Sequence, residues 1–154
     1  MRPGRPRKDE FEYKRKGTRC VFAAFNIRTG HVIADVTPNR KIPRVLSFLN
    51  RIYAAYPRGK IVMVTDNIHT RRGKDAKAWL ASHRRASFVF TPYHGSWLNQ
   101  VEIWLGIMTG KCLRGRSFES TRALAAAIRA FVRRWNREMA RPFNWTYSGR
   151  VLHA

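Results

Sequence analysis

The chain has 154 residues, of which 31 are Lys or Arg and 9 are Asp or Glu, so its formal net charge is +22. This charge favours a polyanionic partner, and nucleic acid fits best because each neutralised phosphate releases counterions. An anionic membrane is the weaker alternative, since no basic amphipathic helix is prominent and no apolar run approaches the roughly 18 residues of a spanning helix.

The first nineteen residues are rich in Arg, Lys, Pro and Gly, which predicts a basic arm or loop with little structure of its own. Residues 20–150 have the length of one domain. No apolar run follows the charged N-terminus, so we expect no signal peptide and a cytoplasmic, nucleoid-associated protein. Cys20 and Cys112 lie far apart and outside any CxxC spacing, which predicts two reduced thiols.

Two short apolar runs, 20–27 and 31–36, flank the turn sequence RTG and predict a β-hairpin. A helix with Pro43 in its first turn should follow, because apolar residues then recur at helical spacing. These residues are Val45, Phe48, Leu49, Ile52 and Tyr53. Residues 61–65, IVMVT, are apolar at almost every position, which predicts a strand covered on both faces.

The second half of the chain predicts a helix near 73–83, a strand at 87–90, and a helix from about residue 97 with Ser96 as its N-cap. The core stripe of that helix is Val101, Trp104, Leu105 and Met108. A last helix, about 120–138, has an apolar face formed by Leu124, Ile128, Phe131, Val132 and Trp135. This order of strands and helices predicts an α/β fold.

Two acids stand out by position. Asp66 directly follows the strand 61–65, where functional groups sit in open α/β sheets, and Glu102 lies off the core stripe of its helix, three residues after Asn99. Two carboxylates brought together favour a cation between them, and hard oxygen ligands suit Mg²⁺, with Mn²⁺ as a substitute. The alternative is structural: Asp66 caps a turn and Glu102 pairs with one of many arginines.

Three segments carry a family resemblance: VTDN at 64–67, FTPYHGSWLNQVEIW at 90–104 and NREMARPFNWT at 136–146. They resemble the catalytic domain of bacterial insertion-sequence transposases of the mariner-like superfamily, which carry a D…D…E/D triad. The likeness runs from about residue 3 to 150. It implies a ribonuclease H-like mixed sheet flanked by helices, transposon-end cleavage followed by strand transfer, and two Mg²⁺ ions held by three carboxylates.

The resemblance also assigns residues. Asp66 matches the second acid of the triad and Glu102 the third, both as metal ligands, while Asn67 and Asn99 match polar residues that flank them. Expected partners are double-stranded DNA, as transposon end and target, and a second copy or an intact transposase. Where relatives tend to have a histidine, this chain has Arg71, and His69 is a candidate substitute.

The family places its first acid on a central strand that precedes the Gly-Arg-Pro loop, and this chain begins at that loop. We therefore expect the first aspartate and its strand to be missing, which would leave facing edges of the hairpin and of the strand 61–65 unpaired. Two hypotheses remain open: an incomplete transposase catalytic domain, or a catalytically inactive DNA-binding remnant. An AT-hook reading of RPGRPRK is a third, weaker signal.

Overall fold

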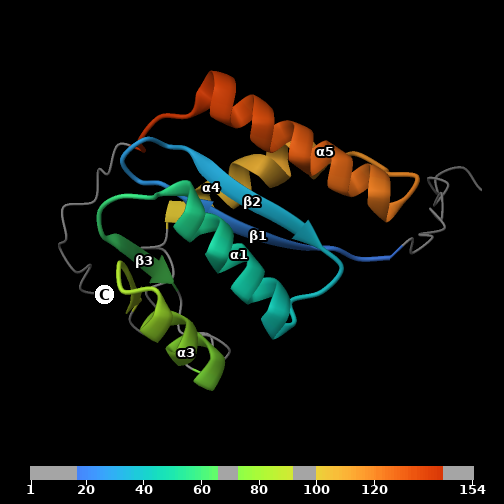
Figure 1. Cartoon of the computed structure of the whole chain (residues 1–154). Coiled ribbons are helices and arrows are strands. Elements are labelled where there is room, and N and C mark those ends of the chain that lie inside the picture. Colours follow the sequence, from blue (N-terminus) through green and yellow to red (C-terminus); the bar gives the residue numbers. More distant parts are fainter. Residues whose placement is uncertain (1–16, 66–72, 92–99, 144–154) are drawn as a thin grey trace, which may run out of the picture.

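The computed structural model describes residues 17–65, 73–91 and 100–143. Its first elements are strands β1 (Cys20–Phe25) and β2 (Val32–Thr37), helix α1 (Ile42–Ala55) and strand β3 (Ile61–Thr65). Helix α3 (Lys74–Ser82), strand β4 (Ala86–Phe90) and helix α4 (Gln100–Met108) follow. The π-helical segment η2 (Thr109–Leu113), helix α5 (Thr121–Arg134) and the π-helical segment η3 (Trp135–Met139) complete the order. Figure 1 shows the arrangement.

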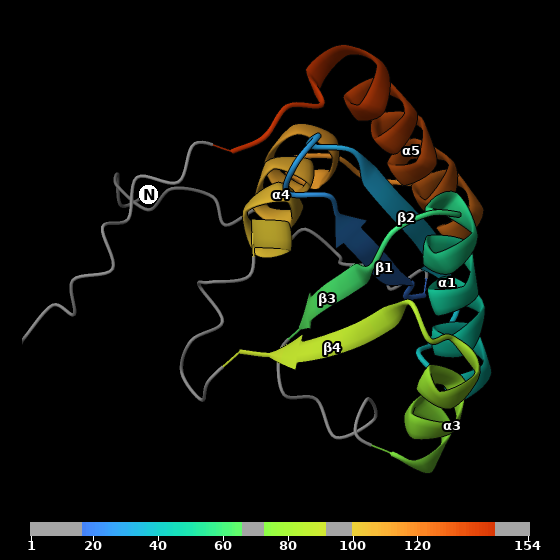
Figure 2. The ribbon, with the colours of Figure 1, turned by 60° about the vertical axis from the view of Figure 1, so that its left-hand side comes forward.

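The described strands form two separate pairs. β1 and β2 make an antiparallel hairpin in which Cys20 lies opposite Thr37 and Phe25 opposite Val32, whereas β3 and β4 are parallel. No ladder joins the two pairs within the described ranges. The hairpin at 20–36 is therefore confirmed, and in the described residues the expected mixed sheet is present as two pieces rather than one (Figure 2).

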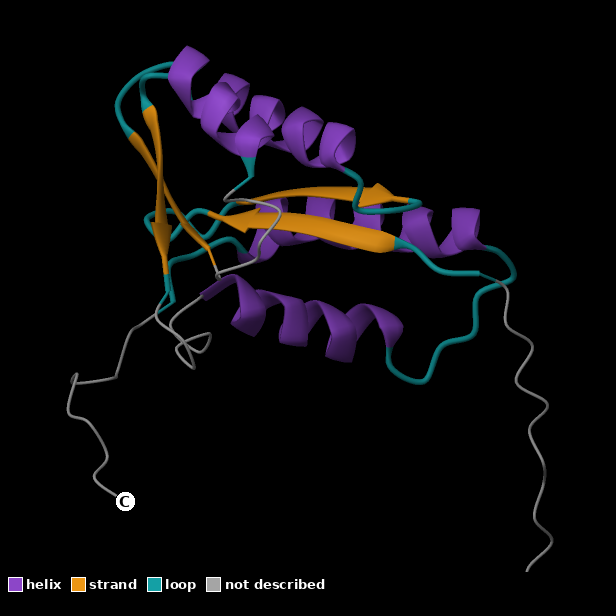
Figure 3. Cartoon of the chain, turned by 90° about the horizontal axis from the view of Figure 1, so that it is seen from below, coloured by secondary structure: helices purple, strands orange, loops and turns teal. Residues whose placement is uncertain are grey.

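The hairpin is the middle layer of the molecule. Val21, Ala23 and Phe25 pack into a first apolar cluster with α4 and α5, while the alternate residues Phe22 and Ala24 pack into a second cluster with α1. Side chains of a strand alternate between its two faces, so one short hairpin contributes side chains to both apolar clusters. Seen from below in Figure 3, helices lie on both sides of the hairpin, and the parallel pair of β3 and β4 lies beside one end of it.

The strand β3 corrects one prediction. Ile61 and Met63 pack on the second cluster, but Val62 is 59% exposed and Val64 49% exposed. Val89 on β4 is also 49% exposed, so the second face of this strand pair is open, and the prediction of a strand covered on both faces is wrong. An apolar run indicates only which side chains could be buried. The face of β3 that carries Val62 and Val64 is buried only if a second layer packs on it, and the described residues provide no such layer.

The other predicted elements are confirmed with shifted ends. α1 has Pro43 in its first turn and buries Phe48, Leu49 and Ile52. α5 begins after Ser120, whose hydroxyl accepts a hydrogen bond from the Ala123 amide, as expected of an N-cap. The single helix predicted over 120–138 is α-helical to Arg134 and π-helical from Trp135. At this change, Trp135 and Asn136 both form hydrogen bonds with the hairpin. The expected N-cap Ser96 lies outside the described residues.

Both cysteines are free thiols. Cys112 is buried in the first cluster, and this burial raises the pKa of its thiol, an effect that nearby Arg116 partly opposes. No helix in the described ranges is both long and apolar enough to cross a membrane.

Candidate functional site

The candidate site is located by the strand β3 and the helix α4. β3 ends at Thr65, which is buried, and the Thr65 carbonyl accepts a hydrogen bond of 2.9 Å from the Thr91 amide just beyond β4. The two parallel strands thus end side by side, at the edge where ligands bind in open α/β sheets. Asp66 and Asn67 follow Thr65 in the sequence, but these two residues and His69 and Asn99 lie outside the described residues.

Glu102 lies in the first turn of α4, and its side chain is exposed. This placement agrees with the prediction that Glu102 lies off the core stripe. A carboxylate is favoured in the first turn of a helix by the unpaired amides there. Across the described ranges, the Glu102 carboxylate has no ion pair, so the alternative that an arginine neutralises it finds no support in this part of the chain.

Aromatic packing fixes the helix that carries Glu102. Trp104 is 0% exposed and Met108 3% exposed, as the core stripe predicted. The Trp104 ring lies 6.2 Å from that of Phe131 and 6.3 Å from that of Trp135, in the latter case edge to face. Such pairs add about 0.5–1.5 kcal/mol beyond the area they bury. The helices α4 and α5 therefore form one aromatic layer beneath the hairpin.

Two residues of the NREMARPFNWT segment attach this layer to the hairpin, and no local sequence pattern indicates their roles. The Trp135 indole donates a 2.8 Å hydrogen bond to the carbonyl of Gly30 in the hairpin turn. Asn136 accepts from the Val32 amide and donates to the Val32 carbonyl, both at 2.8 Å. Gly30 itself has φ of +73°, and a Cβ there would meet the backbone of Arg141.

Two buried polar atoms on α4 lack a partner in the part of the chain that the structure describes: the indole nitrogen of Trp104 and Oε1 of Gln100. Buried polar groups are ordinarily hydrogen-bonded, and an unsatisfied one costs about 1–3 kcal/mol. The N-terminal half of α4 therefore carries two buried hydrogen-bonding atoms that no described residue satisfies.

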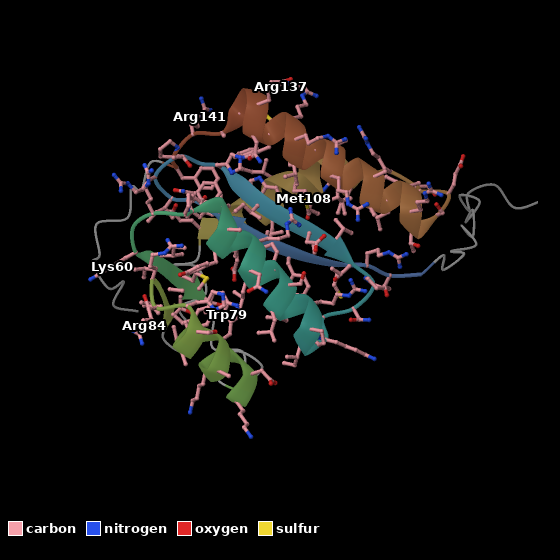
Figure 4. All side chains as sticks on the ribbon, viewed as in Figure 1. Lys60, Trp79, Arg84, Met108, Arg137 and Arg141 are labelled. Carbon is pink, nitrogen blue, oxygen red and sulfur yellow. The ribbon has the colours of Figure 1, made fainter. Side chains whose placement is uncertain are left out.

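Basic side chains surround these elements. Figure 4 shows Arg137 and Arg141 at the outer end of α5 and η3, and Lys60 and Arg84 on another side of the molecule, beside β3 and β4. Arg134 and Arg137 both bind Glu138, and their hydrogen bonds hold the pKa of that carboxyl below its usual range. Exposed Arg122 and Arg133 have no carboxylate partner in the described ranges, so α5 presents uncompensated positive charge.

The donor chemistry of Glu102 suits a hard divalent cation, because its carboxylate is exposed and carries no competing cation in the described part. No group of three or more potential metal ligands forms within residues 17–65, 73–91 and 100–143. The other described acids either interact with other residues or are far from Glu102 in the sequence. Asp35, for example, accepts a hydrogen bond from the Val36 amide, and its carboxylate lies 3.7 Å from the Arg51 guanidinium. Glu102 alone therefore cannot make the expected site.

Comparisons with known proteins agree with this fold. No curated protein matches the sequence. The structure is similar to a chain of the cryoEM structure of simian T-cell lymphotropic virus intasome in complex with PP2A regulatory subunit B56 gamma, with a TM-score of 0.51 and 16% identity. The match covers 71% of this chain and 45% of that chain, so the present chain spans less than half of its length. This likeness supports the ribonuclease H-like fold.

The family of the chain is shown by its sequence. The model of the DDE superfamily endonucleases matches residues 1–125, which include β1 to β4, α4 and both candidate acids. More than half of the chain is matched, and the chain therefore belongs to the DDE superfamily endonucleases.

Proposed function

We propose that this chain is part of the catalytic domain of a DNA transposase of the mariner-like, bacterial insertion-sequence type, in which Asp66 and Glu102 hold Mg²⁺. The family match over residues 1–125 carries the proposal. The exposed carboxylate of Glu102 on a rigidly packed α4, and Asp66 directly after β3, support it. Asn67 and Asn99 would contribute polar contacts beside the two acids. When bound, two such ions can activate a water or 3′-hydroxyl and stabilise the leaving oxygen of a phosphodiester.

The residues of this chain would then have distinct roles. Glu102 and Asp66 bind cation, Trp104 and its aromatic neighbours hold the helix that aims Glu102, and the arginines of α5 contact DNA phosphates. The alternative is a catalytically inactive DNA-binding remnant. The two alternatives differ in metal binding and agree in DNA binding.

Metal binding tests the proposed site. We expect Mn²⁺, followed by electron paramagnetic resonance, to bind the whole chain, and Glu102→Gln to weaken this binding by at least about tenfold, or 1.4 kcal/mol. Glu119→Gln is the matched control, since Glu119 is an equally exposed acid beside the start of α5. Equal Mn²⁺ affinity in the wild type and Glu102→Gln would refute the metal assignment.

DNA binding should be electrostatic and tolerant of sequence. We expect the logarithm of the association constant to fall linearly with the logarithm of salt concentration, by about 0.9 for each phosphate neutralised. Arg133→Gln should reduce this slope by about 1, the value for one lost phosphate contact. Arg134→Gln should change it less, because that guanidinium already binds Glu138 at 2.8 Å. Fluorescence anisotropy with duplexes of unrelated sequence measures both, and an affinity independent of salt would contradict the assignment.

A further inference from the structure

Two turns meet where β3 and β4 begin. Residues 56–60 lead from α1 into β3, and residues 83–85 lead from α3 into β4. The parallel strands pair Ile61 with Ala86, so the two turns that precede them lie side by side. The Ile61 amide donates a 2.7 Å hydrogen bond to the Arg85 carbonyl and joins the two turns directly.

The side chain of Arg85 fixes the first of these turns. Its guanidinium donates to the Tyr56 carbonyl at 2.7 Å and to the Gly59 carbonyl at 3.0 Å. The same guanidinium lies over the Tyr53 ring, 4.2 Å from the ring centroid. Gly59 has φ of +80°, and a Cβ there would meet nothing within 4 Å. The turn is therefore held in one shape while its backbone stays open to a ligand.

Three other cations extend from these two turns: Arg58, Lys60 and Arg84, which we call the basic turn surface. All three are exposed, and none of them forms a hydrogen bond or an ion pair with another described residue. The amides of Arg58, Gly59 and Lys60 likewise donate to no acceptor in the described ranges. Unlike Arg85, whose donors are used within the fold, this surface has free donors and uncompensated positive charge.

We propose that the basic turn surface binds the phosphate backbone of a second segment of duplex DNA, apart from the segment that α5 contacts. Phosphate contacts in protein–DNA complexes come from arginine, lysine and backbone amides, which are the groups left free here. A turn already fixed by Arg85 loses little conformational freedom on binding. Cations held together on one turn pair also repel each other, and a bound polyanion relieves that repulsion.

The basic turn surface is separate from the other functional regions. Lys60 lies five residues before Thr65, so it is about 16 Å along β3 from the edge where the candidate site is located. Figure 4 shows Lys60 and Arg84 on one side of the molecule and Arg137 and Arg141 on another. One chain would therefore contact two DNA segments at once. The choice of DNA as the polyanion rests on the proposed function, whereas the position of the surface does not.

Lysine acetylation, followed by mass spectrometry, tests the surface in the wild-type chain. Lys41 is the internal control, since it is equally exposed and is separated from the basic turn surface by the 14 residues of α1, about 21 Å. With duplex at about ten times its dissociation constant, acetylation of Lys60 should slow about tenfold and that of Lys41 less than about twofold. Unchanged acetylation of Lys60, or equal slowing at both lysines, would overturn the inference. Slowing at Lys60 by phosphatidylserine vesicles but not by duplex would overturn it in favour of a membrane surface.

A matched pair of triple variants tests the second DNA segment. The surface variant combines Arg58→Gln, Lys60→Gln and Arg84→Gln. The control variant removes the same number of arginines and lysines at the other end of α1, where the side chains are also exposed and unpaired among the described residues: Arg40→Gln, Lys41→Gln and Arg44→Gln.

Each protein is loaded on an immobilised short duplex, and capture of a second, labelled duplex from solution is measured. We expect the wild type and the control variant to capture it, and the surface variant to bind it at least about tenfold more weakly. All three should bind the immobilised duplex alike. Equal capture by the two variants, or no capture by a wild type that binds the first duplex, would overturn this inference and leave the proposed function in place. Failure of the wild type to bind the first duplex would instead contradict the proposed function, and with it the choice of DNA.

Discussion

Trp104→Ala is expected to cost about 3–5 kcal/mol of the free energy of unfolding, the range for truncating a buried Trp or Phe to alanine. Trp104 is 0% exposed, and its ring contacts those of Phe131 and Trp135. A domain of this size has a total stability of roughly 5–15 kcal/mol, so much of the variant would be unfolded at physiological temperature. Urea unfolding at one fixed chain concentration measures the loss.

Ile103→Ala is the control for this prediction. Ile103 is the preceding residue of α4 and is 46% exposed, so its truncation should cost less than about 1 kcal/mol. Trp104→Phe separates packing from polarity. It keeps a ring in the cluster and removes the indole N–H that lacks an acceptor in the described part of the chain, so two effects of opposite sign partly cancel. Equal losses for Trp104→Ala and Ile103→Ala would show that α4 does not depend on this aromatic layer.

The local elements could be predicted because their signals are short-range. Two apolar runs around the turn RTG predicted the hairpin, and helical spacing placed Trp104 and Met108 in the core and Glu102 outside it, as the structure confirms. The face of β3 could not be predicted in the same way. The pattern of residues 61–65 is apolar on both faces, and whether a second layer covers Val62 and Val64 depends on segments far away in the sequence.

The connections between layers were the least predictable part. Asn136 and Val32 are 104 positions apart, and nothing in either local pattern indicates that an asparagine side chain will bond a strand edge. The candidate site shows the same limit. Helical spacing predicts that Glu102 is exposed, but the assignment of Glu102 and Asp66 to one metal site rests on family resemblance, because helical spacing says nothing about a residue 36 positions earlier in the sequence.

The second large effect is expected at Asn136. Val32 is 1% exposed, and Asn136 is the partner of both its outward backbone groups. Asn136→Ala would leave a buried amide and a buried carbonyl without partners, at about 1–3 kcal/mol each, and we expect a total loss of roughly 2–6 kcal/mol by urea unfolding. Asn39→Ala is the control, since the Asn39 side chain accepts from the exposed amide of Lys41 at 3.2 Å and its loss should cost less than about 1 kcal/mol.

Asn136→Asp makes the same contact depend on pH. A carboxylate can accept from the Val32 amide, but only the protonated acid can also donate to the Val32 carbonyl, so folding should raise the pKa of the introduced group above its unfolded value of about 3.9. The stabilising contribution is then fully present below the unfolded pKa and is lost as pH rises through the folded pKa. The stability of this variant relative to the wild type should therefore fall between mildly acidic and neutral pH. A constant difference across that range would show that Asn136 does not donate to the β2 edge.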